Sequence, residues 1–251
     1  MASMLSNARE SATSCEPPSA RFRELTLAEG YAISRSHFLH RLVHNEKDVG
    51  RKVGLTAVSG RERYGVSEPS FGYLTSSMKS DGSISRKTVI RAQAEGEIVF
   101  YLKRDLTGRE ISPEELAEAV ECVSMGIEII DNRIGNPPYE IQDHVADNAF
   151  ACGYVLGSER RAVKSIDFEN LVIVGTLNGV QKSTGVGRDV LGSPIRSATW
   201  LANRLVSLGE PLRAGQIIFS GCFGTPIPFD RGDTLRFSAE GFDTLTLTCE
   251  T

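Results

Sequence analysis

Two glutamates stand two residues apart in the apolar stretch AEGEIVFYL, residues 94–102. In a β-strand, side chains two positions apart point to the same face, so Glu95 and Glu97 should lie side by side. Two carboxylates that close in an apolar setting repel one another and lose hydration, and a cation removes both penalties. Mg²⁺ and Mn²⁺ favour carboxylate oxygens. The pair therefore indicates a metal site, with an ordinary solvated strand as the alternative.

A third carboxylate is available in GIEIIDNRI, residues 126–134, where Glu128 and Asp131 again interrupt apolar residues. Glu128 stands between Ile127 and Ile129, so in a strand its side chain points away from both. We therefore expect Glu128, rather than Asp131, to be the third metal ligand. A solvated edge strand is the alternative explanation for these acids.

A lysine also lies in apolar surroundings, in GRKVGLT, residues 50–56. Burying Lys52 there is costly unless its ammonium group has a partner. Beside carboxylates and a metal, that group can transfer a proton or hold a carboxylate or an enolate. An exposed strand lysine is the alternative.

Two later stretches have the residues of a pocket wall. In VADNAFACGYVLG, residues 145–157, Asp147 and Asn148 precede an apolar run, where they either cap a turn or support the site. The stretch SGCFGTPIPFDRGD, residues 220–233, contains glycines and prolines typical of a shaped loop between strands. Asp233, at its end, is expected to close a turn.

The whole chain has the composition of a globular protein, with 251 residues, 40% of them hydrophobic and 24% charged. This length suits one large domain, or one domain with an appendage. The net charge of -4 argues against a nucleic-acid partner, and no apolar run approaches the roughly 20 residues of a membrane span. The N-terminus lacks an apolar signal core, so residues 1–23 are expected to form a flexible tail.

The five cysteines are scattered and show no CxxC spacing. Their odd number and spacing argue against a disulfide framework or a zinc knuckle and suit a reducing cytoplasm, where we expect the protein to be located. His37, His40 and His44 recur at helical spacing on a polar stretch, which is typical of surface residues rather than of a metal cluster.

Three helix starts are recognisable. The segments TLAE, residues 26–29, and SPEE, residues 112–115, have the capping-box pattern, and Pro194 follows Ser193 at the start of a third helix. We expect the second helix to run to about Met125.

The remaining chain is rich in segments that favour strands. β-Branched and aromatic residues are concentrated at residues 98–102, 170–179, 215–221, 233–239 and 243–250. No alternation of strands and helices appears, so a doubly wound sheet is not expected. The sequence predicts a β-rich α+β protein, with a helical segment at residues 24–50 before a β-rich body of residues 51–251.

Taken together, these stretches resemble the 2-oxopent-4-enoate hydratase and 4-oxalocrotonate decarboxylase group of the fumarylacetoacetate hydrolase superfamily. The matching pieces, in the family's order, are GRKVGLT, YGVSEPSFGYL, AEGEIVFYLKRDL, IEIIDNRI, VADNAFACGYVLG and GSPIRSATWLANRLVSLGEPLRAGQIIFSG. They extend from about residue 24 to the C-terminus. The resemblance implies a fumarylacetoacetate-hydrolase-like mixed β-roll with a helical N-terminal segment, assembled into a homo-oligomer.

The resemblance also implies a Mg²⁺ or Mn²⁺ site. Glu95 and Glu97 match the family's Glu-x-Glu ligands, Glu128 matches the third carboxylate ligand, and Lys52 matches the active-site lysine.

One departure from the family concerns acid–base chemistry. Hydratases of this group commonly carry an acid where this chain has Ser70, in VSEPSFG, and Glu68 is a possible substitute. The expected catalytic positions are therefore Lys52, Glu68 and Ser70. The expected substrate-binding positions are Leu55, Asp147, Ser183, Gly221 and Cys222.

The activity implied is metal-dependent chemistry on a small 2-oxo or 2-hydroxydienoic acid, with no nucleic-acid or membrane partner. A hydratase ketonises a 2-hydroxydienoate and adds water to give a 4-hydroxy-2-oxo acid. The alternative is a decarboxylase of a 2-oxo-3-enedioate. Phe223 and the spacing of Pro226 and Pro228 resemble the corresponding loop of the decarboxylases more closely than that of the hydratases. An acylpyruvate-type C–C hydrolase is least expected, because it needs a His–Glu pair and His144 is the only histidine outside the N-terminal helix.

Overall fold

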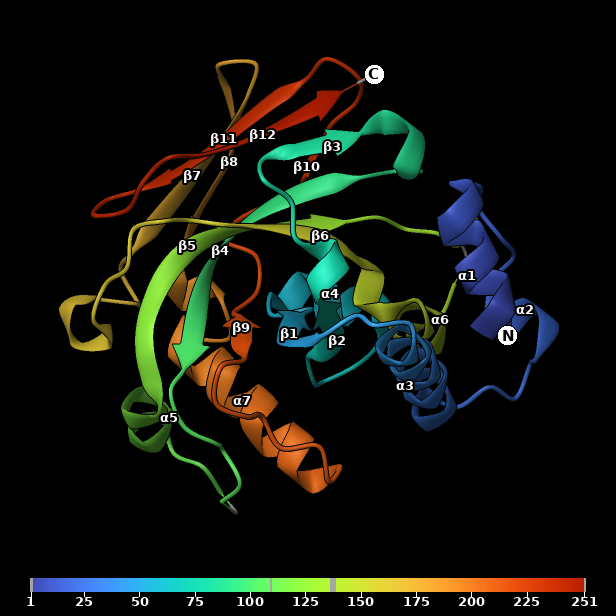
Figure 1. Cartoon of the computed structure of the whole chain (residues 1–251), viewed down its shortest axis with the longest axis horizontal. Helices are drawn as coiled ribbons and strands as arrows, with labels where there is room; N and C mark the ends of the chain where they lie inside the picture. The colour runs from blue at the N-terminus through green and yellow to red at the C-terminus, as the bar shows by residue number, and fades with distance from the viewer. Residues whose placement is uncertain (1, 109, 136–138, 251) are drawn as a thin grey trace.

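A large mixed sheet forms the centre of the computed structural model, which describes residues 2–108, 110–135 and 139–250. Within these ranges the sheet has seven strands in the order β2-β1-β9-β4-β5-β6, with β10 paired to β4 (Figure 1). The short strand β9 runs parallel to β1 and antiparallel to β4, so it joins the two halves of the sheet. The strands are β1 (Asp48–Gly54), β2 (Ser70–Thr75), β4 (Gln93–Leu102), β5 (Val120–Ile130), β6 (Ala151–Leu156), β9 (Ile217–Phe219) and β10 (Ile227–Pro228).

A smaller sheet of five strands, counted over the same described ranges, has the order β3-β12-β11-β7-β8 and lies at the top of Figure 1. Its strands are β3 (Ser83–Ser85), β7 (Val172–Leu177), β8 (Val180–Val186), β11 (Thr234–Ala239) and β12 (Leu245–Glu250). A Cβ atom on Gly96 of β4 would lie 2.6 Å from Phe237 Cδ1 and 2.8 Å from Ile173 Cγ2 of this sheet. Gly96 therefore lets the two sheets meet, while Glu95 and Glu97 point to the opposite face of β4.

The helices gather in two places. Figure 1 shows α1, α2, α3 and α6 together on the right, and α5 and α7 below the large sheet. The α-helices are α1 (Ala2–Ser11), α2 (Pro18–Arg21), α3 (Leu27–Val43), α4 (Val58–Tyr64), α5 (Pro113–Ala119), α6 (Ile141–Ala146) and α7 (Pro194–Ser207). The short 3₁₀ helices are η1 (Ser76–Met78), η2 (Arg86–Thr88), η3 (Asn148–Phe150), η4 (Val163–Ser165) and η5 (Gly187–Asp189). In the described part of the chain no helix is long and apolar enough to cross a membrane.

Both predicted capping boxes are present. Thr26 Oγ1 accepts a hydrogen bond from the Glu29 N–H at 3.2 Å, and Ser112 Oγ accepts one from the Glu115 N–H at 3.2 Å. In each pair the glutamate carboxylate accepts the N–H of the capping residue in return. These reciprocal bonds satisfy amide groups that have no partner inside the helix, and so fix where α3 and α5 begin.

The predicted length of the second helix is wrong. It ends at Ala119, and strand β5 begins at Val120 instead of helix continuing to Met125. β5 pairs with β4 along its length, including Val123 with Phe100. This long-range pairing outweighs the local helical signal, because the β-branched residues of the segment pack well in the centre of a sheet.

The N-terminal residues differ from the expected flexible tail. They include helix α1, in which Leu5 and Ala8 are only 3% and 4% exposed. Leu5 belongs to one apolar cluster with Ile134 and Phe150. Two apolar side chains three residues apart give a weak signal, and their burial depends on a surface supplied by distant residues.

The predicted helical N-terminal segment corresponds to α3, which packs on the body of the protein. The Tyr31 ring stacks on Phe71 of β2 at a centroid distance of 4.6 Å. Strand β1 already begins at Asp48, inside the range 24–50. The structure confirms the β-rich α+β class with a helical N-terminal segment.

Candidate active site

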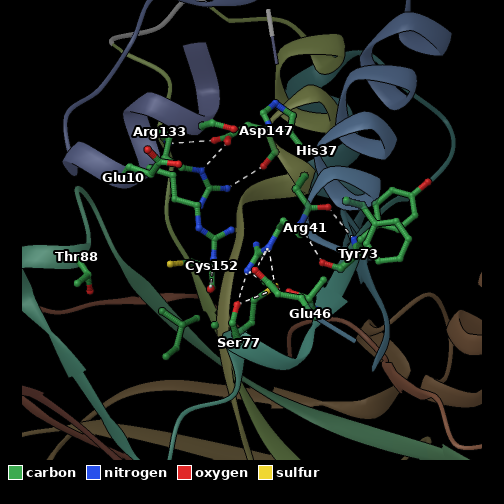
Figure 2. Close-up of a pocket in the computed structure, with 18 of the residues that line it drawn as sticks. Glu10, His37, Arg41, Glu46, Tyr73, Ser77, Thr88, Arg133, Asp147 and Cys152 are labelled. Carbon is green, nitrogen blue, oxygen red and sulfur yellow. Dashed lines mark hydrogen bonds and ion pairs between the residues drawn. The ribbon is translucent and has the colours of Figure 1, made fainter. Parts of the chain in front are cut away.

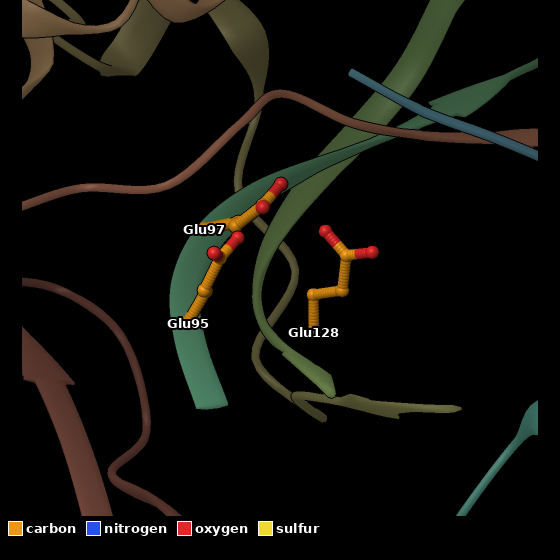
Figure 3. A group of neighbouring side chains, drawn as sticks. All are labelled: Glu95, Glu97 and Glu128. Carbon is orange, nitrogen blue, oxygen red and sulfur yellow. The ribbon is translucent and has the colours of Figure 1, made fainter. Parts of the chain in front are cut away.

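Three glutamates meet on neighbouring strands of the large sheet. Glu95 of β4 is paired directly with Glu128 of β5, and Glu97 lies two residues further along β4, opposite Gly126. One carboxylate oxygen from each glutamate lies within 4.8 Å of those from the other two (Figure 3). Glu97 and Glu128 are 0% exposed and Glu95 is 8% exposed. We call these three residues the acidic cluster, and antiparallel pairing is what assembles it.

Burial makes the charges of the acidic cluster unfavourable. Burial and the charge of Glu128 raise the pKa of Glu95 to about 7, although Lys52 opposes this shift. Burial and the same neighbour raise the pKa of Glu97 well above its ordinary value. Glu97 Oε1 and Glu128 Oε2 have no hydrogen-bond donor among the described residues. Buried carboxylates that repel one another and lack donors fit a divalent cation.

Lys52 of β1 supplies a positive charge beside the acidic cluster. Its Nζ lies 3.0 Å from Glu128 Oε1, and the side chain is 3% exposed. Burial alone would lower the pKa of Lys52, but the charges of Glu128 and Glu95 outweigh burial and raise it. The lysine is therefore a cation held at the edge of the site.

A serine and a histidine converge on the same place as Lys52. Ser70 Oγ lies 3.0 Å from His144 Nε2, and both residues are buried. A Cβ atom on Gly54 would lie 2.7 Å from Ser70 Oγ, 3.6 Å from Lys52 Nζ and 3.8 Å from His144 Nε2. Glycine at position 54 thus leaves a small space bounded by three polar groups.

His144 was not among the site residues expected from the sequence. Its pKa is lowered to about 3 by burial and by the charges of Lys52 and Arg63, so the imidazole is neutral. It follows an acid, Asp143, in a short helix that the strand-rich surroundings concealed. A histidine in the mostly apolar run from residue 144 to 151 was the available signal, since burying an imidazole calls for a partner.

The glycine-rich loop after β9 reaches the acidic cluster, as expected for a pocket wall. The Gly221 N–H donates a hydrogen bond of 2.7 Å to Glu97 Oε2. Burial and the charge of Glu95 raise the pKa of the neighbouring Cys222 well above its ordinary value. The Oγ atom of Ser183 in β8 accepts a hydrogen bond from the Thr225 N–H at 2.9 Å and so anchors the loop.

Two other expected site residues lie in different surroundings. Glu68 is exposed, whereas Ser70 is 1% exposed. The Asp147 carboxylate is held by Arg133, whose Nε lies 2.6 Å from Oδ1 and whose N–H donates to Oδ2 at 3.0 Å. Both carboxylate oxygens of Asp147 are thus engaged by Arg133.

Leu55 and Asp131 both take part in hydrogen bonds that involve backbone groups, Leu55 through its own carbonyl and Asp131 through its carboxylate. Leu55 adopts a φ of +57°, which is uncommon for a residue with a Cβ atom, and its carbonyl accepts a bond from Arg61 at 2.9 Å. Asp131 accepts hydrogen bonds from the Arg91 N–H at 2.7 Å and the Ile90 N–H at 3.0 Å. Its carboxylate is thus occupied by backbone amides, in contrast to that of Glu128.

Comparison with known proteins links this chain to one family. A model of the fumarylacetoacetate (FAA) hydrolase C-terminal family matches residues 44–249. The chain is 35% identical over 248 residues to the 2-hydroxyhexa-2,4-dienoate hydratase of Comamonas testosteroni, covering 97% of this chain and 94% of that protein. It is 33% identical over 242 residues to the 2-keto-4-pentenoate hydratase of Paraburkholderia xenovorans (strain LB400), covering 96% and 90%.

A solved structure is also similar over nearly the whole chain. It is the 4-oxalocrotonate decarboxylase from Pseudomonas putida G7, complexed with magnesium and adipate. The match has a TM-score of 0.95 and 27% identity, and it covers 99% of this chain and 95% of that chain.

Proposed function

We propose that this chain, which belongs to the fumarylacetoacetate hydrolase family, is a hydratase that converts a 2-hydroxy-2,4-dienoate of the 2-oxopent-4-enoate type and water into a 4-hydroxy-2-oxo acid. The observation that carries the proposal is the buried acidic cluster beside Lys52, in a chain 35% identical to a dienoate hydratase over 97% of its length. A binding scaffold without activity has no need of three buried carboxylates that repel one another.

The acidic cluster fits a divalent cation, and we assign Mg²⁺ or Mn²⁺ to it. Glu95, Glu97 and Glu128 would be the ligands, since hard cations take carboxylate oxygens and tolerate open positions for small ligands. When bound, such an ion supplies Lewis-acid stabilisation of the negative charge that develops on a 2-oxo acid. The donor-free oxygens of Glu97 and Glu128 support this assignment.

Lys52 is assigned two roles, to stabilise the negative charge of the substrate enolate and to transfer a proton. For a five-carbon dienoate, the net reaction moves the 2-hydroxyl proton to C5, bonds the water oxygen to C4 and places a water proton on C3. A buried ammonium group can hold the enolate oxygen and deliver a proton to carbon. The position of Lys52 Nζ, 3.0 Å from Glu128, supports this role, because one group then borders both the cluster and the space at Gly54.

Ser70 and His144 are assigned to the water molecule. Ser70 stands where related hydratases commonly have an acid, and the exposed Glu68 is poorly placed to substitute for it. The neutral imidazole of His144, 3.0 Å from Ser70 Oγ, can accept a proton from water or pass one through the serine hydroxyl. We propose that the pair orients the water that adds to C4.

A decarboxylase acting on a 2-oxo-3-enedioate is the second candidate. The high structural similarity to 4-oxalocrotonate decarboxylase favours it. The same acidic cluster and Lys52 would then stabilise an enolate formed by loss of CO₂, and no water would be added. The hydratase is preferred because the curated relatives named hydratase match at higher identity over nearly the full length.

We further propose that the enzyme is a cytoplasmic homo-oligomer acting on a small molecule. All five cysteines are free thiols, which suits a reducing compartment. Oligomerisation is carried over from the family resemblance, and sedimentation equilibrium would measure the subunit number.

Product identification tests the proposed function. Purified protein with Mg²⁺ is given freshly made 2-hydroxypenta-2,4-dienoate and, separately, 2-oxohex-3-enedioate, and each mixture is followed by NMR. We expect 4-hydroxy-2-oxopentanoate from the first compound. Glu97→Gln should abolish product formation, whereas the exposed control Glu118→Gln on α5 should not.

The opposite results are equally informative. Release of CO₂ from the second compound, with no hydration of the first, would replace the hydratase by the decarboxylase. Full activity of the Glu97→Gln variant would show that the acidic cluster is not required for the reaction.

A further inference from the structure

A cavity of about 990 Å³ lies between the N-terminal helices and the large sheet. Its walls come from α1 and α3 on one side and from η1, β3, η2 and β6 on the other (Figure 2). The lining residues that the structure describes do not include any member of the acidic cluster. Ile129 of β5 lines the cavity, and its neighbour Glu128 belongs to the cluster. Since adjacent strand residues face opposite ways, the cavity and the cluster lie on opposite faces of β5.

Three guanidinium groups from distant segments line this cavity: Arg9 of α1, Arg41 of α3, and Arg133 after β5. Arg41 Nη2 lies 2.9 Å from Glu46 Oε2, and Arg133 is paired with Asp147. Figure 2 shows both of these ion pairs.

Arg9 has no such partner. Among the described residues it makes no ion pair, and its Nη2 has only a long hydrogen bond of 3.5 Å to the Cys152 carbonyl oxygen. Burial, followed by the charges of Arg133 and Arg41, lowers the pKa of Arg9 to about 10. The charges of Arg133 and Arg41 at Arg9 are each larger in effect than the opposing charge of Glu46, so the field at Arg9 is positive.

Two further donors in the wall lack acceptors. Arg133 Nη1 and His37 Nε2 are buried and have no hydrogen-bond partner among the described residues. His37 Nδ1 lies 3.0 Å from Ser6 Oγ. Burial and the charge of Arg133 lower the pKa of His37 to about 4, so its ring is neutral. In the tautomer of His37 in which Nδ1 accepts the Ser6 hydroxyl proton, the ring proton lies on Nε2 and is available for donation.

The remaining acids of the wall do not meet this need. Glu46 and Asp147 are engaged by Arg41 and Arg133, and Glu10 and Asp81 are exposed. Donors without acceptors in a positively charged cavity are matched by a ligand that has several negatively charged oxygens.

We propose that this cavity is a binding site for a compact anion with phosphate or carboxylate oxygens, held by Arg9, Arg133 Nη1 and His37 Nε2. Guanidinium groups bind such oxygens through paired hydrogen bonds, and a partly buried cavity strengthens each bond. The anion site is separate from the proposed hydration site, and this proposal does not depend on whether hydratase activity is found.

Isothermal titration calorimetry on the metal-free protein tests the proposal, with inorganic phosphate in one series and succinate in another. We expect saturable binding of one equivalent of at least one of them, and the better ligand identifies the source chemistry. Arg9→Gln should weaken binding about tenfold or more, because it removes a charge-assisted pair of hydrogen bonds. The exposed control Arg23→Gln and the cluster variant Glu97→Gln should bind as the wild type does.

Circular dichroism and thermal unfolding establish that each variant is folded. If Arg9→Gln fails to fold, His37→Gln removes a second donor and should also weaken binding. The proposal would be overturned if folded Arg9→Gln and His37→Gln bind the anions with the affinity of the wild type. It would also be overturned if the wild type shows no saturable binding of either anion.

Discussion

Glu95 and Glu128 are direct partners across the antiparallel strands β4 and β5, although both are acids and both are buried. Like charges directly opposite one another destabilise a sheet. A cation bound by both carboxylates would offset their repulsion, which explains why the two acids are paired here. The proposed metal should therefore act on the stability of the whole fold as well as on activity.

Mg²⁺ should stabilise the wild-type protein. At a free concentration about a hundredfold above its Kd, a ligand of the folded state alone adds about 2.7 kcal/mol to the free energy of unfolding. Differential scanning fluorimetry with and without Mg²⁺ measures the effect. Glu97→Gln should lose most of the shift, and an unchanged shift in this variant would contradict the assigned ligand set.

The metal-free protein should lose stability as the pH rises. The pKa of Glu95 is about 7 in the folded protein, above its ordinary value of 4.5, so the folded state holds a proton that the unfolded chain releases. This contribution is complete below about pH 4.5 and is lost as the pH rises through about 7. Urea unfolding across this range measures the slope. Glu95→Gln should flatten it, and a slope equal to that of the wild type would refute the prediction.

Lys52→Met should lower kcat about a hundredfold or more, because it removes the group assigned to proton transfer. Lys52→Arg keeps the charge, but its planar group cannot reproduce the ammonium geometry, so recovery should be partial. Steady-state kinetics on the dienoate gives both values. Lys103→Met, at an exposed position, is the matched control, and equal rates for the two methionine variants would exclude a role for Lys52.

Ser70→Ala and His144→Gln should separate hydration from ketonisation. If the pair orients water, both variants should form 4-hydroxy-2-oxo acid slowly while still exchanging deuterium into C5 in D₂O. NMR in D₂O follows the two events in one sample. A parallel loss of exchange and hydration would show that the pair acts on the enolate rather than on water.

Gly54→Ala should impair activity more than stability. The new Cβ atom would lie 2.7 Å from Ser70 Oγ and only 3.6 Å from Lys52 Nζ, so it would fill the space between the polar groups. Overpacking of this kind costs about 1–3 kcal/mol. Thermal unfolding and kinetics on the same preparation test the comparison, and Gly60→Ala, whose Cβ would make only ordinary contacts with Leu55, is the control.

Local signals in the sequence were sufficient where a few neighbouring residues decide the structure. The capping boxes at Thr26 and Ser112 are complete within four residues, so their sequences predicted the helix starts correctly. Glu95 and Glu97 were predicted to share a face for the same reason, since the two-residue repeat of a strand is a local property.

Long-range partners decided the features that the sequence did not reveal. The segment after Ala119 is a strand because β4 pairs with it, and α1 is a packed helix because its Leu5 packs in one cluster with Ile134 and Phe150. His144 reaches Ser70 across 74 positions of the chain. Contacts of this kind depend on the folded topology and leave little trace in local composition.

The placement of β9 between β1 and β4 has a consequence for biosynthesis. The Gly221 amide that binds Glu97 lies 124 positions later in the chain, so the centre of the large sheet stays open until β9 has left the ribosome. Contacts so distant in sequence form slowly and late. A nascent chain that stops before β9 therefore has the three glutamates without the strand that closes the sheet around them, and metal ions in the cell should meet a competent ligand set only on a nearly finished polypeptide.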